Sequence, residues 1–174
     1  IDNFNPSGRS GVIVPLRLFK GEHKGIDVID TLSAFESMDI PVHIIADFSN
    51  STDLISAKIK RLDGLLDGNL YLHESISDAE KFSLLANSQL MIFPSKFEGF
   101  GLPPVEAAVM NLPCVSFNLP VFAEVTPFRN TMVDLQSGYD ELVNVALNLL
   151  NSSQESVFDQ SAVSGTATFV GDEH

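Results

Sequence analysis

Short apolar runs rich in β-branched residues recur along the chain, and amphipathic stretches separate them. This alternation limits the fold more than any other feature. The runs predict strands over residues 11–16, 42–47, 69–74, 90–95 and 113–117, with a weaker sixth at 131–135. The stretches between and after them predict helices over residues 25–38, 53–66, 77–88, 105–110 and 138–153, the third opening with a Ser77/Glu80 capping box. Strands joined by helical crossovers form a parallel sheet covered on both faces. We therefore predict an α/β fold with a doubly wound parallel sheet of about six strands.

The predicted strand order also indicates where a ligand would bind. In the common order 3-2-1-4-5-6, the first and fourth strands are neighbours where the order reverses. Ligands of such sheets bind in the crevice at the carboxyl ends of those two strands. The loops that follow residues 11–16 and 90–95 are therefore the places to search.

Composition excludes several classes of function. The 174 residues carry 10 basic and 23 acidic side chains, so the net charge is −13. A surface this acidic repels nucleic acid and anionic lipid. The apolar runs are too short to span a bilayer. The single cysteine, Cys114, suits a reducing compartment, and the histidines lack metal-ligand spacing, so we expect no bound metal.

The pattern suggests one main domain with short flanking segments. Residues 1–10 are a lead-in or interdomain linker, residues 11–153 form the domain, and residues 154–174 are a polar tail, either partly helical or disordered. The chain opens on Ile1 rather than methionine, and we expect it to be a piece of a longer protein.

The loop after the first predicted strand is unusually basic for this chain. Arg17, Lys20 and Lys24 lie within eight positions, although the whole sequence has only 10 basic residues. Such a cluster suits an anion site. A solvated loop that only sustains solubility is an equally good interpretation from charge alone.

The loop after the fourth predicted strand combines glycines with a helix start. Gly99 and Gly101 let backbone approach a ligand closely, and Pro103 with Pro104 fits the first turn of a helix. A helix N-terminus reached through glycines can bind phosphate through its free amides. Those amides would belong to Phe100, Gly101, Leu102 and Val105.

Two glutamates flank this turn. Glu106 in the first helical turn could simply complement the helix dipole, and Glu98 could simply be solvated. A carboxylate beside phosphate is repulsive, so in a nucleotide site both would instead accept hydrogen bonds from neutral sugar hydroxyls.

The segment PSKFEGFGLPPVEA, residues 94–107, closely resembles the E-x7-E signature of retaining glycosyltransferases with the GT-B fold, in family 4 and its relatives (glycosyl transferases group 1). The matching positions are Glu98, Gly99, Phe100, Gly101, Leu102, Pro103, Glu106 and Ala107. The first loop is similar to the family's R-L…K-G segment, with Arg17 and Lys24 in place. The resemblance covers residues 11–153 and is strongest over residues 90–125.

This resemblance implies the C-terminal half of a GT-B fold, a Rossmann-like domain that binds a nucleoside-diphosphate sugar. Arg17 and Lys24 would bind the diphosphate, Glu98 the donor sugar and Glu106 the ribose hydroxyls. Glu98, Arg17 and Lys24 would be catalytic. The turn through Gly99, Phe100, Gly101 and Leu102 would also contact the donor.

The resemblance implies no cofactor and no metal. A glycan, lipid-linked or other sugar acceptor would bind through an N-terminal domain missing from this chain, so we expect the chain alone to transfer almost no sugar. The implied role is glycan or polysaccharide biosynthesis, in the cytoplasm or at the membrane periphery without a transmembrane segment.

Several positions depart from the family pattern. Asn111 replaces a glycine, Leu16 replaces the glycine before Arg17, and Leu119-Pro120 replaces glycines before a segment in which Glu124 matches the family's glutamate. Asn tolerates a left-handed helix end, so the turn at Asn111 should survive. The Leu119-Pro120 change leaves a second hypothesis open, a non-catalytic relative that binds nucleotide or sugar or scaffolds a complex. A flavodoxin-like signalling domain would need an acidic first loop and is disfavoured.

Overall fold

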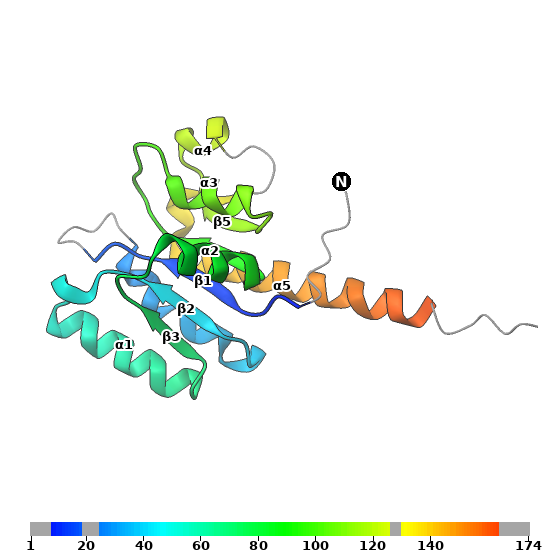
Figure 1. Cartoon of the computed structure of the whole chain (residues 1–174), viewed down its shortest axis with the longest axis horizontal. Coiled ribbons are helices and arrows are strands. Elements are labelled where there is room, and N and C mark those ends of the chain that lie inside the picture. The colour runs from blue at the N-terminus through cyan, green and yellow to red at the C-terminus, as the bar shows by residue number, and fades with distance from the viewer. Residues whose placement is uncertain (1–7, 19–24, 126–129, 164–174) are drawn as a thin grey trace, which may run out of the picture.

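A single parallel sheet organises the structure, a computed structural model that describes residues 8–18, 25–125 and 130–163. Its six strands lie in the order β3-β2-β1-β4-β5-β6, all parallel (Figure 1). Their bounds are Val12–Pro15 (β1), Val42–Ile45 (β2), Leu70–His73 (β3), Leu90–Phe93 (β4), Cys114–Phe117 (β5) and Asn130–Val133 (β6). The predicted doubly wound sheet and its strand order are confirmed, including the weak sixth strand.

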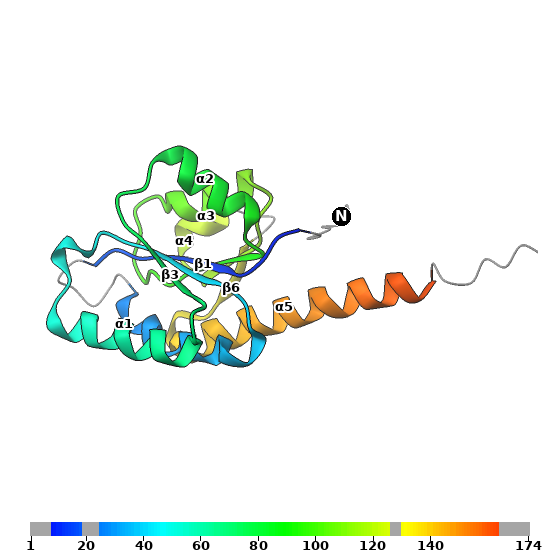
Figure 2. The ribbon, with the colours of Figure 1, turned by 60° about the horizontal axis from the view of Figure 1, so that its bottom comes forward.

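Helices cover the sheet on both faces, as near-continuous apolar strands require (Figure 2). One face packs on α1 (Asp53–Leu66), α5 (Gly138–Val163) and the 3-10 helices η2 (Ile26–Asp30) and η3 (Leu32–Met38). The other packs on α2 (Asp78–Asn87), α3 (Leu102–Val109) and α4 (Pro120–Val125). Alternate β1 residues serve the two cores, with Val12 and Val14 in the first and Ile13 in the second. Two short 3-10 helices, η4 (Phe48–Asn50) and η5 (Leu135–Ser137), complete the described elements.

Residues 26–38, predicted as one helix, form the 3-10 pair η2 and η3. β-branched residues crowd the first half of this segment, which lowers its α-helix propensity. The backbone N–H of Thr31 and its hydroxyl both donate to the carbonyl of Val28, at 2.9 and 2.8 Å. This i→i+3 bond fixes the tighter 3-10 geometry at the junction.

Side chains cap the N-termini of α1 and α2. The hydroxyl oxygen of Thr52 accepts a hydrogen bond from the N–H of Ile55 at the start of α1. At the start of α2, Ser77 and Glu80 form the predicted reciprocal capping box. These side chains satisfy backbone donors in the first turn of each helix, which would otherwise lack a partner.

The C-terminus of α3 explains how Asn111 replaces the family's glycine. Asn111 has φ of 55°, in the left-handed region. Its N–H donates to the carbonyl of Ala108, and the N–H of Leu112 donates to that of Ala107. These two bonds make a Schellman motif. The Arg9 guanidinium donates to the carbonyls of Met110 and Asn111, which satisfies further acceptors at the same helix end.

Strands β1 and β4 separate at their carboxyl ends. The β1–β2 pairing covers all four residues of β1, whereas the β1–β4 pairing covers Val12 and Ile13 only. In β1 the N–H groups of Val12 and Leu16 point to β2, so position 15 faces β4. Pro15 has no N–H to donate there, and the ladder ends. This proline therefore keeps the β1–β4 ladder short beside the crevice that the reversal of strand order creates.

Helix α5 extends beyond its predicted end. It runs to Val163, whereas the sequence pattern weakens after residue 153. The added turns contain neither glycine nor proline, so nothing in that stretch breaks the helix. Within the described residues, no helix combines the length and the apolar character needed to cross a membrane.

Candidate functional site

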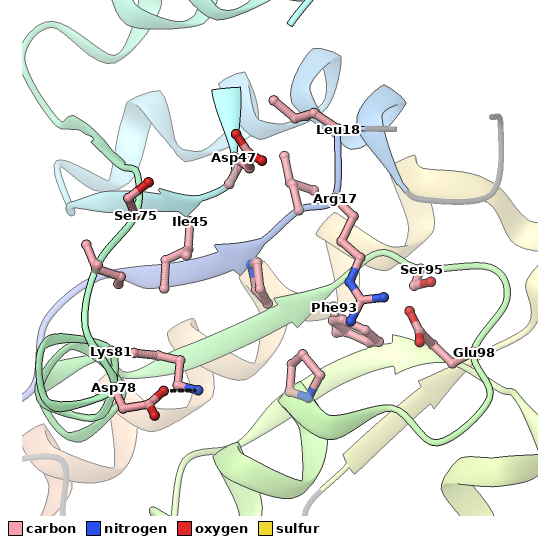
Figure 3. A pocket seen from close by; sticks show the side chains of 15 residues that line it. Arg17, Leu18, Ile45, Asp47, Ser75, Asp78, Lys81, Phe93, Ser95 and Glu98 are labelled. Carbon is pink, nitrogen blue, oxygen red and sulfur yellow. Dashed lines mark ion pairs between the residues drawn. The ribbon is translucent and has the colours of Figure 1, made fainter. Parts of the chain in front are cut away.

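A cavity of about 440 Å³ opens at the carboxyl ends of β1, β2 and β4 (Figure 3). Arg17 and Leu18 enter it from the end of β1, Asp47 from the end of β2 and Ser75 from the loop after β3. Glu98 lines it from the loop after β4. This is the crevice in which ligands of doubly wound sheets bind. A cavity therefore lies where the strand order predicts one, and the binding of a donor there stays a prediction.

Arg17 and Glu98, predicted from separate loops, point toward one another across this cavity (Figure 3). A smaller adjoining cavity of about 220 Å³ is lined by Leu102 and Glu106. Arg17 lines both cavities, as do Pro15 and Pro103. The structure therefore places Glu98 on one cavity and Leu102 and Glu106 on the other, with Arg17 lining both.

Other predicted site residues either do not line these two cavities or fall outside the described residues. Gly99, Phe100 and Gly101 line neither cavity, and the side chain of Phe100 is 55% exposed. Lys20 and Lys24 lie outside the described residues, so the second cation predicted for the first loop stays a prediction.

Gly101 is required by packing as well as by its backbone conformation. It caps the N-terminus of α3 with φ of 75°. A Cβ atom placed on it would lie 2.2 Å from Cε1 of Phe122. Phe122 belongs to α4, a helix that sequence reasoning missed, and it is fully buried against Phe93 with ring centroids 5.9 Å apart. The glycine thus lets α4 pack behind the turn of the E-x7-E segment.

Gly25 lies where the two loops of the crevice pack against each other. It has φ of 80°, and an added Cβ would lie 2.6 Å from Cγ of Pro94. Pro94 directly follows β4. The end of the first loop therefore packs against the start of the loop that carries Glu98, and this close approach needs a residue without a side chain.

Lys96 turns away from the cavity and anchors the same loop from behind. Its Nζ lies 4.3 Å from the centroid of the Tyr139 ring and 5.7 Å from that of Phe117, both cation–π distances. Tyr139 sits in the first turn of α5, and burial raises the pKa of its hydroxyl to about 12. Ser95, whose hydroxyl donates to the carbonyl of Phe97, stabilises the turn before Glu98.

Lys81 is a cavity residue that sequence reasoning missed. Its Nζ lies 2.8 Å from Oε1 of Glu106 and 3.2 Å from Oδ1 of Asp78. The hydrogen bond with Glu106 is the main cause of a raised pKa for the Lys81 ammonium. The i,i+3 pair with Asp78 is visible in the sequence. The pair with Glu106 joins two residues that are 25 positions apart and lie on different helices. Only the packing of α2 beside α3 reveals it.

The segment that departs most from the family pattern packs into the core. Leu119 is 6% exposed and Phe122 is fully buried, while Glu124 is exposed. None of residues 119–125 that the structure describes lines either cavity.

His43 and His73 form a close pair outside the cavity. Nδ1 of His43 is 2.9 Å from Nε2 of His73, and the His43 ring stacks on Tyr71. Burial lowers the pKa of both histidines, and the neighbouring His73 lowers that of His43 further. Among the described residues, no cluster of three or more His, Cys, Asp or Glu side chains could hold a metal ion.

Solved structures with a similar fold include a glycosyltransferase and a trehalose-phosphate synthase. A glycosyltransferase from Rickettsia africae ESF-5 matches with a TM-score of 0.62 at 18% identity, over 85% of this chain and 42% of that one. A trehalose-phosphate synthase from Burkholderia vietnamiensis matches with a TM-score of 0.60 at 16% identity, over 83% and 38%. At these identities the likeness establishes the fold alone.

Curated relatives are similar in sequence over shorter stretches. The serotype-specific mannosyltransferase WbdA of Escherichia coli is 35% identical over 100 residues, 55% of this chain and 12% of that protein. The O-antigen chain mannosyltransferase RfbU of Salmonella typhimurium is 41% identical over 61 residues, 35% of this chain and 17% of that protein. The matched region is thus a small part of each of these relatives.

The family profile described as Glycosyl transferases group 1 matches residues 13–152, which run from β1 into α5 and include both cavities. The match covers most of the chain, and its strands, crevice and E-x7-E segment all fall inside it. The chain therefore belongs to the glycosyl transferases group 1 family.

Proposed function

We propose that this chain is the donor-binding domain of a retaining, family-4-like glycosyltransferase of the GT-B type, and that its donor is a nucleoside-diphosphate sugar. The observation that carries the proposal is that Arg17 lines two cavities at the carboxyl ends of β1 and β4, one with Glu98 and the other with Glu106. Arg17 comes from the segment after β1 and the two glutamates from the segment after β4, and their charges suit a ligand with both an anionic and a hydroxyl-rich part.

Each group has a distinct role in this proposal. Arg17, with Lys24, binds the diphosphate, and the guanidinium offers a planar fork of donors that matches phosphate oxygens. When the bond from the anomeric carbon to the diphosphate oxygen breaks, its electron pair stays on the diphosphate. The two cations stabilise that growing charge. Glu98 accepts hydrogen bonds from the donor sugar and Glu106 from the ribose, with the turn through residues 99–102 beside them.

The donor sugar and the acceptor are further parts of the proposal. Relatives named as mannosyltransferases make mannose the first sugar to test. An acceptor domain outside this chain completes the cleft, so the 174-residue chain alone transfers almost no sugar. Polysaccharide biosynthesis in the cytoplasm is the corresponding context. No metal or cofactor takes part, because the cations and the α3 N-terminus neutralise the leaving diphosphate.

The test is calorimetric titration of UDP, GDP and their sugar forms into the full chain. Replacing Arg17 by Ala should weaken diphosphate binding about 10- to 150-fold, the value of a hydrogen bond to a charged group. Arg61→Ala, an exposed position on α1 away from the cavity, is the matched control and should leave affinity unchanged. Equal losses in both variants, or no binding of any of these nucleotides, would overturn the proposal.

A separate measurement tests the non-catalytic alternative. A longer form that includes an acceptor domain should transfer sugar from the donor that binds, with retention at the anomeric carbon read by NMR. Binding without transfer in that form would favour a relative that only binds nucleotide. The burial of Leu119 and Phe122 in the core argues against that alternative, because the altered segment does not face the cavity.

A further inference from the structure

We propose that Lys81 is a positioning residue for nucleoside recognition, holding the carboxylate of Glu106 so that its free oxygen faces the ribose hydroxyls. This inference rests on the proposed function, in which Glu106 binds the ribose. It assigns a role to a side chain of α2, a helix that carries no part of the E-x7-E segment.

The two partners of Lys81 are unequal. Asp78 is 88% exposed, so its ion pair with Lys81 is screened by solvent and contributes little. Glu106 and Lys81 are only 23% and 26% exposed, and their 2.8 Å contact is a charge-assisted hydrogen bond in a partly buried setting. The pair with Glu106 is therefore the one that holds both side chains in place.

The contact uses one oxygen of Glu106 and leaves the other available. Lys81 binds Oε1, and within the part of the chain that the structure describes no hydrogen bond reaches Oε2. A carboxylate oxygen accepts readily from a hydroxyl, whereas it repels phosphate. A carboxylate fixed at one oxygen and open at the other is suited to select a diol.

Lys81 also balances charge in the site. It lines both cavities, as does Arg17. Asp47, Asp78 and Glu98 line the larger cavity and Glu106 the smaller. A diphosphate adds further negative charge. Without Lys81, Glu106 would keep an unpaired, partly buried charge, which costs free energy unless the carboxylate turns out to solvent. That rotation removes the acceptor geometry for ribose.

The aromatic neighbour of Lys81 restricts its movement. Its Nζ lies 5.0 Å from the centroid of the Phe82 ring, which adds a cation–π contact to the two carboxylates. An ammonium held on three sides keeps its charge and its position, in agreement with the raised pKa of Lys81.

The experiment compares nucleotides with and without ribose hydroxyls. UDP and GDP, and their 2′,3′-dideoxy forms, are titrated calorimetrically into the full chain and its Lys81→Met variant. The substitution should weaken binding of the better ribonucleotide about tenfold or more, the value of a hydrogen bond to a charged group. It should weaken the dideoxy form clearly less, because that form loses only the nearby cation. Lys81→Arg should restore most of the affinity. Lys60→Met on α1, away from both cavities, is the matched control.

Two outcomes would overturn the inference while leaving the proposed function intact. One is an equal loss for ribonucleotide and dideoxynucleotide in Lys81→Met. The other is full additivity of Lys81→Met with Glu106→Gln, since a positioning role requires the second substitution to add little once the first is made. The Arg17→Ala variant tests the proposed function separately from this inference, because its loss of affinity depends on diphosphate binding alone. Unfolding midpoints of all variants exclude a general loss of structure.

Discussion

Replacing Gly101 by Ala tests how the E-x7-E segment is supported. The methyl group would stand 2.2 Å from the Phe122 ring, compared with about 3.5–4.0 Å for an optimal carbon contact, so the ring must move by roughly 1–2 Å. Phe122 is fully buried and packs edge-on against Phe93, which leaves it little room. Overpacking of this kind costs about 1–3 kcal/mol.

The backbone adds a second cost at the same position. Gly101 has φ of 75°, and an L-residue in the left-handed region costs about 1–2 kcal/mol. The two effects together predict a loss of about 2–5 kcal/mol in the free energy of unfolding, measured by urea denaturation followed by circular dichroism. For a chain of this length each kcal/mol lowers the midpoint of thermal unfolding by roughly 2–4 °C.

Gly99 supplies the matched control. It lies two positions away, it is not among the glycines with positive φ, and an added Cβ would meet nothing within 4 Å. Gly99→Ala should therefore change stability by no more than about 0.5 kcal/mol. Gly101→Ala combined with Phe122→Leu should cost less than the sum of the two single changes, because the smaller side chain removes the overlap. Equal stability of the two alanine variants, or strict additivity of the pair, would refute the packing argument.

Two further predictions concern other parts of the molecule. Burial lowers the pKa of His43 and His73 below 6.5, so as the pH falls the unfolded chain takes up protons before the folded chain does. The free energy of unfolding should stay constant above pH 6.5, the pKa of histidine in the unfolded chain. It should decline as the pH falls from 6.5 toward the lowered pKa values of the folded histidines. His43→Phe, which keeps a ring on Tyr71, should flatten this decline in unfolding midpoints measured from pH 7.5 to 5. Asn111→Gly should change the free energy of unfolding by no more than about 0.5 kcal/mol. Asn111→Val should lose about 1–2 kcal/mol in urea denaturation, because only the β-branched residue is strained in the left-handed region. Similar stabilities of the two variants would contradict the Schellman assignment.

Most of the sheet was predictable because β1, β4 and β5 are short apolar runs, and the other strands are short β-rich runs between helical stretches. Helix α1 was predictable to its ends, since Thr52 caps it and its apolar positions recur at helical spacing. The switch-point crevice followed from the strand order alone. Gly99, Phe100 and Gly101 were expected beside the ligand from their motif, yet Gly101 is also demanded by Phe122, which no local pattern reveals.

The features that escaped prediction depend on contacts between distant segments or on very short elements. Helix α4 has six residues, too few for a periodic pattern, and it opens on a proline that also suits a loop. The pair of Lys81 with Glu106 arises from the packing of two helices. The 3-10 character of η2 and η3 depends on Thr31 bonding back to Val28, which helical spacing cannot distinguish from an α-helix.

Pro15 has no N–H, and this affects the strand geometry of the crevice in the absence of a ligand. A residue with a free donor at that position could extend the ladder from β1 to β4 and draw the two strands together. Binding would then have to break a hydrogen bond before a ligand could enter. Because Pro15 has no N–H, the β1–β4 ladder stays short whether or not a ligand is bound. The empty and the occupied crevice can therefore share one strand geometry. Ligand entry then requires only the loops and side chains around the crevice to rearrange.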